Sequence, residues 1–193
     1  MRHALLIAAA CLWAGTANGH FLQLIPSEDV LPEGGSVEVD VRFSHPMDMG
    51  PVMDLARPTA VRLVRADGEV DLLPALRAQA PNGASAWTLT VELPEPGGAM
   101  LVVEPLPYWE PAEGKYIVHY TKTFVDAYAT GEGWAEPIGL PVEILPLVRP
   151  TGLWTGNLFR GVVLQDGRPV PFAAIEVEYL NDGSVTPPND AFV

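Results

Sequence analysis

The stretch Val37-Glu38-Val39-Asp40-Val41-Arg42-Phe43 alternates apolar and polar side chains without interruption. Successive side chains of a strand point to opposite faces, so this pattern predicts a β-strand with one buried face. Similar apolar stretches, separated by proline and glycine turns, lie at residues 60–64, 87–93, 100–104, 116–124 and 142–145. Short strands at this spacing predict an all-β fold, an antiparallel β-sandwich of the immunoglobulin-like (Ig-like) kind.

The composition narrows the class of protein and its partners. The chain has 193 residues, of which 48% are hydrophobic, with 24 acidic and 11 basic side chains. This apolar fraction is that of a core-forming protein, and the length suits one domain and part of another. The formal net charge is −13, whereas a protein that binds phosphate backbones needs clustered Lys and Arg. Nucleic acid is therefore excluded as a partner, whereas a negative field favours cations.

The first nineteen residues have the pattern of a secretory signal peptide. A basic start is followed by an apolar run at 4–14 and by small residues up to Gly19. This run is shorter than the roughly 20 residues that a membrane helix needs, so we expect a periplasmic chain without direct membrane insertion. Cleavage after Gly19 would remove Cys11, the one cysteine, and would leave His20 as the amino terminus. An alternative interpretation takes Cys11 as a lipoprotein attachment site.

The later part of the chain indicates a second unit. After a sandwich at 20–147, a linker begins at Val148. The pattern further on is that of a strand, a turn and a strand, at residues 159–164, 166–169 and 173–179. An isolated hairpin is only marginally stable in water. We therefore expect 148–193 to be a linker and the first hairpin of a second, truncated β domain that is poorly ordered or swapped between molecules.

Three histidines follow the predicted signal peptide: His20, His45 and His119. A free amino-terminal His20 offers its α-amine and its ring Nδ1 to one metal ion, and imidazole binds copper, nickel, cobalt and zinc. His45 follows the first strong strand, and His119 lies inside the predicted strand at 116–124. We predict that the three side chains converge on one metal ion. In the competing interpretation His20 is frayed, His45 is a turn residue and His119 is a hydrogen-bonded core residue.

Other side chains near the histidines leave alternatives open. Three methionines follow His45, namely Met47, Met49 and Met53. Thioether sulfur prefers Cu(I), although methionine also serves as core filler. The carboxylates that would form an alternative site are Asp48, Glu110 and Glu113. The chain lacks the common signatures of hydrolases and nucleotide-binding enzymes, so we expect no catalytic activity and no catalytic residues.

Several separate stretches carry a resemblance to a known family: HFLQLIPS at 20–27, RFSHPMDMGPVM at 42–53, PLPYWEPAEGK at 105–115, HYTK at 119–122 and GLWTGN at 152–157. They are similar to the bacterial DUF4198 family, described as the periplasmic component of nickel and cobalt uptake systems. The resemblance implies a protein that binds Ni²⁺ or Co²⁺ and hands the ion to the membrane subunits of an energy-coupling-factor (ECF) or ABC-type transporter. It also implies that the second unit is a transthyretin-like β-sandwich.

Two other functions remain open at this point. An amino-terminal His also occurs in copper enzymes that cleave polysaccharides by oxidation, and Tyr108, Trp109 and Trp134 supply aromatic side chains for such a substrate. A metal-free exported sandwich with a structural or adhesive role would need none of the histidines. We expect a metal-binding protein that is not an enzyme. Its ion is Ni²⁺ or Co²⁺, with Cu²⁺ an alternative because Cu²⁺ binds most tightly in the Irving–Williams order.

Overall fold

The computed structural model describes residues 20–111, 113–154 and 156–184, which form strands, short 3₁₀ turns and loops. The predicted all-β class is confirmed. Within these described ranges, no helix is long and apolar enough to span a membrane. The predicted signal peptide, with Cys11, lies outside the described residues.

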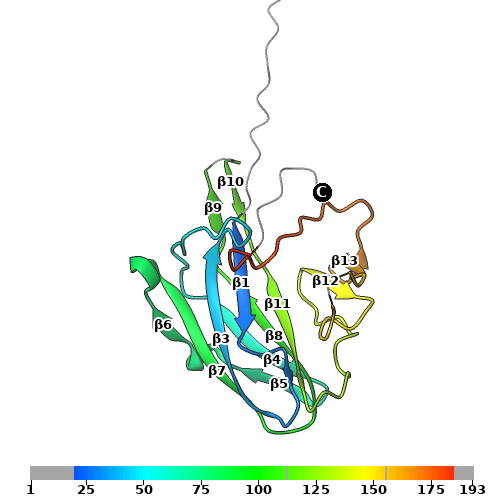
Figure 1. The fold of residues 1–193 in the computed structure, drawn as a ribbon. Helices are drawn as coiled ribbons and strands as arrows, with labels where there is room; N and C mark the ends of the chain where they lie inside the picture. Colours follow the sequence, from blue (N-terminus) through cyan, green and yellow to red (C-terminus); the bar gives the residue numbers. More distant parts are fainter. Residues whose placement is uncertain (1–19, 112, 155, 185–193) are drawn as a thin grey trace, which may run out of the picture.

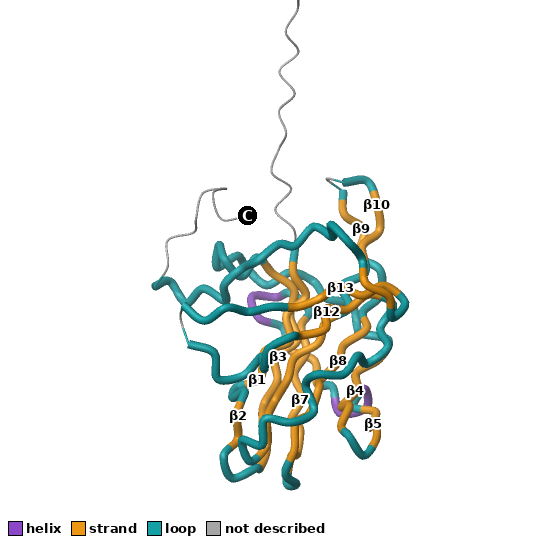
Figure 2. Tube along the Cα trace, turned by 90° about the vertical axis from the view of Figure 1, so that its right-hand side faces the viewer, coloured by secondary structure: helices purple, strands orange, loops and turns teal. Residues whose placement is uncertain are grey.

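Two largely antiparallel sheets pack face to face (Figures 1 and 2). The first sheet has the order β1-β3-β7-β6, with bounds Phe21–Pro26, Gly35–Ser44, Ala86–Leu93 and Arg77–Gln79. The second sheet has the order β2-β11-β8-β4-β5, with bounds Val30–Leu31, Thr121–Ala127, Gly97–Glu104, Ala60–Arg65 and Gly68–Asp71. β2 and β11 pair in parallel. Two 3₁₀ turns, η1 (Leu73–Ala75) and η2 (Pro81–Gly83), flank β6.

The main core lies between these two sheets. On β3, Val37, Val39 and Val41 are at most 1% exposed, whereas Glu38 and Asp40 face solvent. The period-2 pattern of this stretch therefore predicts its buried face correctly. Burying each valine contributes roughly 1.5–3 kcal/mol relative to leaving it exposed. β3 therefore contributes three fully buried side chains to the core, and His45 follows its last residue, Ser44.

A second cluster covers the outer face of the second sheet. Met100 and Val102 of β8 pack there against Leu140 and Trp134, which belong to the segment after β11. Because this segment covers them, residues 99–103 of β8 are buried on both faces. Such a strand has a continuous apolar run instead of an alternating one, as its sequence AMLVV shows.

The buried carboxylate of Asp126 holds the start of that covering segment. It accepts hydrogen bonds from the Thr130 backbone N–H and hydroxyl and from the Gly131 N–H, at 2.9, 3.1 and 2.8 Å. We expect Asp126→Ala to lower the free energy of unfolding by about 2 kcal/mol, because these donors lose their acceptor. Urea denaturation measures this loss. Asp67→Ala, at a carboxylate that is 84% exposed, is the control and should stay within about 0.5 kcal/mol of wild type. Equal losses in the two variants would contradict this role.

The predicted strand at 116–124 is in fact two strands. β10 (Lys115–Ile117) pairs with β9 (Tyr108–Glu110), and β11 pairs with β8, while residues 118–120 belong to neither. The prediction that His119 lies inside a strand is therefore wrong. The cause lies on the opposite side of the ladder, where Pro105 and Pro107 separate β8 from β9 and have no N–H to donate.

A third sheet stands beside the sandwich and contains β12 (Val142–Pro146), β13 (Gly161–Gln165) and β14 (Arg168–Pro169). The expected last strand of the first unit, β12, thus pairs across the linker with β13. The β13–β14 turn is the expected one, since Asp166 and Gly167 both have positive φ, as a two-residue hairpin turn requires. The expected strand at 173–179 is not formed, and that segment has an irregular path.

Candidate metal centre

His20 and His45 lie next to each other at one end of the sandwich. The β1–β3 register pairs Phe21 with Ser44, so the residues just beyond this pair are His20 and His45. Their ring centroids are 4.4 Å apart. Figure 1 shows the start of β1, the end of β3 and the β9–β10 hairpin at this same end of the molecule. The structure therefore brings together two of the three predicted ligands.

Glu110 contacts His20, and the sequence did not indicate this contact. Its carboxylate Oε2 lies 2.9 Å from His20 Nδ1, and the residue is 8% exposed. The sequence suggested Glu110 only as part of an alternative carboxylate site. A carboxylate on a ring nitrogen fixes the orientation and tautomer of the imidazole, as it does for histidines that bind metals. Nδ1 is also the nitrogen that a chelate with the α-amine would use.

His119 lies between β10 and β11 and contacts the ring of Phe43, with ring centroids 5.1 Å apart. Its Nε2 is buried and has no hydrogen-bond partner among the described residues. Burial lowers the pKa of His119, the nearby charge of His20 lowers it further, and the charge of Glu110 opposes this shift. His119 therefore presents a buried, unpartnered nitrogen, and its lowered pKa favours the neutral imidazole, which is the form that binds a metal.

The Phe43 ring stands at the centre of this arrangement. Its centroid lies 5.5 Å from that of His20 and 5.0 Å from that of Tyr108, in addition to its contact with His119. A cavity of about 110 Å³ opens beside it, lined by residues that include Leu22, Phe43, Leu55, Leu106, Tyr108 and His119. In the described part of the chain, no three His, Cys, Asp or Glu side chains lie close enough together to hold a metal ion. His20 and His119 thus contact the Phe43 ring and His45 contacts His20, but the three histidines do not form a closed ligand set.

The other residues suggested by the sequence are dispersed. Met47 is buried, Met49 is 56% exposed, and Met53 packs against the main core. Asp48 is exposed. Glu113 pairs with Lys115 at the tip of the β9–β10 hairpin.

The three aromatic side chains that the sequence suggested for a polysaccharide lie in different surroundings. Tyr108 lies beside His20, with ring centroids 5.6 Å apart. Trp109 is 47% exposed and packs edge-on against Tyr116. Trp134 packs on the outer face of the second sheet, in the cluster of Met100 and Phe124. This distribution gives no support to a flat aromatic surface around the histidines.

The family model described as "Domain of unknown function (DUF4198)" matches residues 17–193. The chain therefore belongs to the DUF4198 family. No curated protein and no solved structure matches it.

Proposed function

We propose that this member of the DUF4198 family binds Ni²⁺ or Co²⁺ through His20, His45 and His119 and delivers the ion to a membrane transporter, without catalysing a reaction. The observation that carries the proposal is the chain of ring contacts at one end of the sandwich, in which His20 contacts both His45 and Phe43 and His119 contacts Phe43. They come from sites up to 99 residues apart in sequence, so local sequence does not account for their meeting.

The donor atoms suit a borderline cation. Imidazole nitrogens bind nickel, cobalt and copper, and a nearby carboxylate supplies negative charge. The unpartnered Nε2 of His119 fits a site that gains its partner when the ion arrives, because a buried nitrogen without a partner is otherwise costly. His119 lies in the irregular segment 118–120, so it can move without breaking a ladder. We expect metal binding to draw His119 past the Phe43 ring toward His20 and His45.

The α-amine of His20 is the fourth proposed donor. It becomes available only if the chain is cleaved after Gly19. A metal bound by the amine and Nδ1 would replace the contact between Nδ1 and Glu110, which leaves the Glu110 carboxylate beside the ion. If the metal used Nε2 instead, Glu110 would keep its contact with Nδ1 and the amine would be unnecessary.

Extending the mature chain by one residue separates these two modes. We expect a protein starting Gly-His20 to bind Ni²⁺ at least tenfold more weakly than one starting at His20, because the amine no longer forms a chelate with Nδ1. A tenfold loss of affinity corresponds to about 1.4 kcal/mol of binding free energy. Isothermal titration calorimetry with Ni²⁺, Co²⁺ and Cu²⁺ measures the three affinities. A Gly extension at the carboxyl terminus is the matched control. Unchanged affinity would overturn the amino-terminal chelate, and the absence of binding to all three ions would overturn the proposed function.

A further inference from the structure

The segment after β14 returns to the sandwich and lies on the turn that carries His45 (Figure 1). Glu178 Oε2 accepts a hydrogen bond from the Met47 N–H at 3.1 Å. Asn181 Nδ2 donates to the Met47 carbonyl oxygen at 2.9 Å, and the Asn181 N–H donates to the Pro46 oxygen at 3.3 Å. The peptide groups on both sides of Met47 are thus bonded to a segment more than 130 residues away in sequence. We call residues 173–184 the strap.

The turn under the strap has few other hydrogen bonds. The Gly50 N–H donates to the His45 oxygen at 2.9 Å, and the Met49 N–H donates to the Pro46 oxygen at 3.3 Å. Met49 has φ of 52°, a left-handed conformation that a methionine does not prefer. His45 lies just beyond the end of β3, where β1 provides no further ladder bonds. The strap thus supplies three hydrogen bonds to this turn, at Met47 and Pro46.

We propose that Glu178 and Asn181 are positioning residues, which hold His45 against His20 by fixing the backbone of Met47. This inference rests on the proposed function, because it assigns the strap to the same metal site. It adds that the second unit of the chain contributes to the site by fixing the backbone next to His45. Pre-organisation of this kind raises affinity because less conformational freedom is lost when the ion binds.

Substitutions at the two residues test the proposal in the full mature chain. Glu178→Ala removes the acceptor for the Met47 N–H, whereas Glu178→Gln keeps an oxygen in the same place. Asn181→Asp replaces the donor to the Met47 oxygen with an acceptor. Asp182→Asn is the matched control, since Asp182 accepts local hydrogen bonds, from the Ser184 backbone and side chain. We expect Glu178→Ala and Asn181→Asp to weaken Ni²⁺ binding about tenfold and Glu178→Gln and Asp182→Asn to stay near wild type.

Two measurements without metal make the result independent of the proposed function. Hydrogen exchange of the Met47 amide should become faster in Glu178→Ala, while exchange in β3 stays slow. The NMR signals of the His45 ring should also shift, because the ring changes its position relative to His20. Unchanged exchange or an unchanged His45 ring signal in Glu178→Ala would overturn the proposal even if the wild type bound no metal. Faster exchange with unchanged Ni²⁺ affinity in a metal-binding wild type would also overturn it.

Discussion

Ni²⁺ binding to the mature chain is expected to weaken at least tenfold in His45→Ala, and by a similar factor in His119→Ala. The proposed site has three imidazoles, so each variant loses one ligand. A tenfold loss of affinity corresponds to about 1.4 kcal/mol of binding free energy. His45 is next to His20, with ring centroids 4.4 Å apart, so its removal takes away the imidazole that lies beside the amino-terminal histidine. Isothermal titration calorimetry at neutral pH provides both dissociation constants.

Met49→Ala is the control for this comparison. Met49 belongs to the same turn as His45 and is 56% exposed, so its truncation tests whether any change in the turn weakens binding. Affinity like that of wild type would also exclude its sulfur as a ligand. Should His119→Ala bind as tightly as wild type, the site would reduce to His20, His45 and the neighbouring Glu110. If His45→Ala binds as tightly as wild type, the proposed ligand set is incorrect.

The period-2 pattern predicted β3 because an alternating stretch has one low-energy arrangement, with its apolar side chains in the core. This pattern also located His45 just past the end of the strand. It could not place His20 beside His45, since that depends on the register of β1 on β3. Glu110 was missed as a partner of His20 for the same reason. The two residues are 90 positions apart, and no local signal records such a contact.

Alternation misled the prediction in two places. Residues 116–124 appeared to form one strand, but ladder bonds also require a partner, and Pro105 and Pro107 lie opposite the break at 118–120. Residues 173–179 alternate as well, with Ile175 and Val177 apolar, yet no neighbouring strand pairs with them in the described structure. Their polar side chain Glu178 bonds instead to the turn at Met47. Both errors concern pairing between distant segments, and each affects a residue near the candidate site.

The second large effect is expected in stability, from Glu143→Ala. Glu143 of β12 is 5% exposed, and its carboxylate accepts hydrogen bonds from the Lys122 ammonium on β11 and from the Ile138 and Gly139 N–H groups. It thereby joins the third sheet to the sandwich. Removing one partner of a buried ion pair leaves the other charge without compensation, so we expect the free energy of unfolding to fall by about 3 kcal/mol. Urea denaturation at pH 7 measures the difference.

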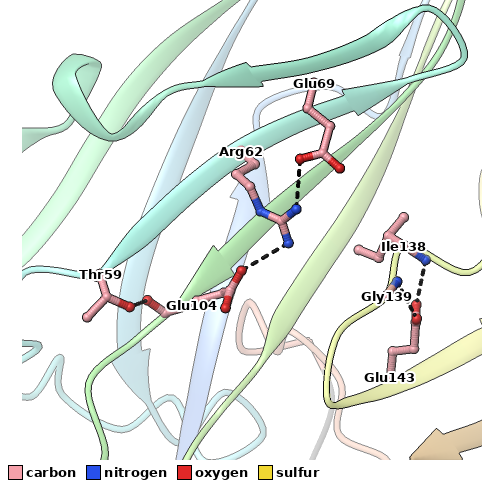
Figure 3. A network of polar contacts seen from close by, with 7 residues as sticks. All are labelled: Thr59, Arg62, Glu69, Glu104, Ile138, Gly139 and Glu143. Carbon is pink, nitrogen blue, oxygen red and sulfur yellow. Dashed lines mark hydrogen bonds and ion pairs between the residues drawn. The ribbon is translucent and has the colours of Figure 1, made fainter. Parts of the chain in front are cut away.

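Figure 3 shows both Glu143 and the exposed counterpart that serves as its control, Glu69 paired with Arg62. The Glu69 side chain is 49% exposed, so Glu69→Ala should cost only about 0.5 kcal/mol. A loss in Glu143→Ala no larger than that in Glu69→Ala would show that the buried pair does not stabilise the junction.

Acid provides a second test of the same pair. Burial alone would raise the pKa of Glu143, but the hydrogen bonds from Lys122, Ile138 and Gly139 hold that pKa below its ordinary value. A carboxylate with a lowered pKa stabilises the fold above its unfolded-state pKa of about 4.3, and this contribution is lost as the pH falls through the lower folded value. Below about pH 4.3 the stability of wild type should therefore fall more steeply than that of Glu143→Gln, which has no proton to bind there. If the free energy of unfolding falls with pH in parallel for the two proteins, Glu143 is not held in its charged form by these three donors.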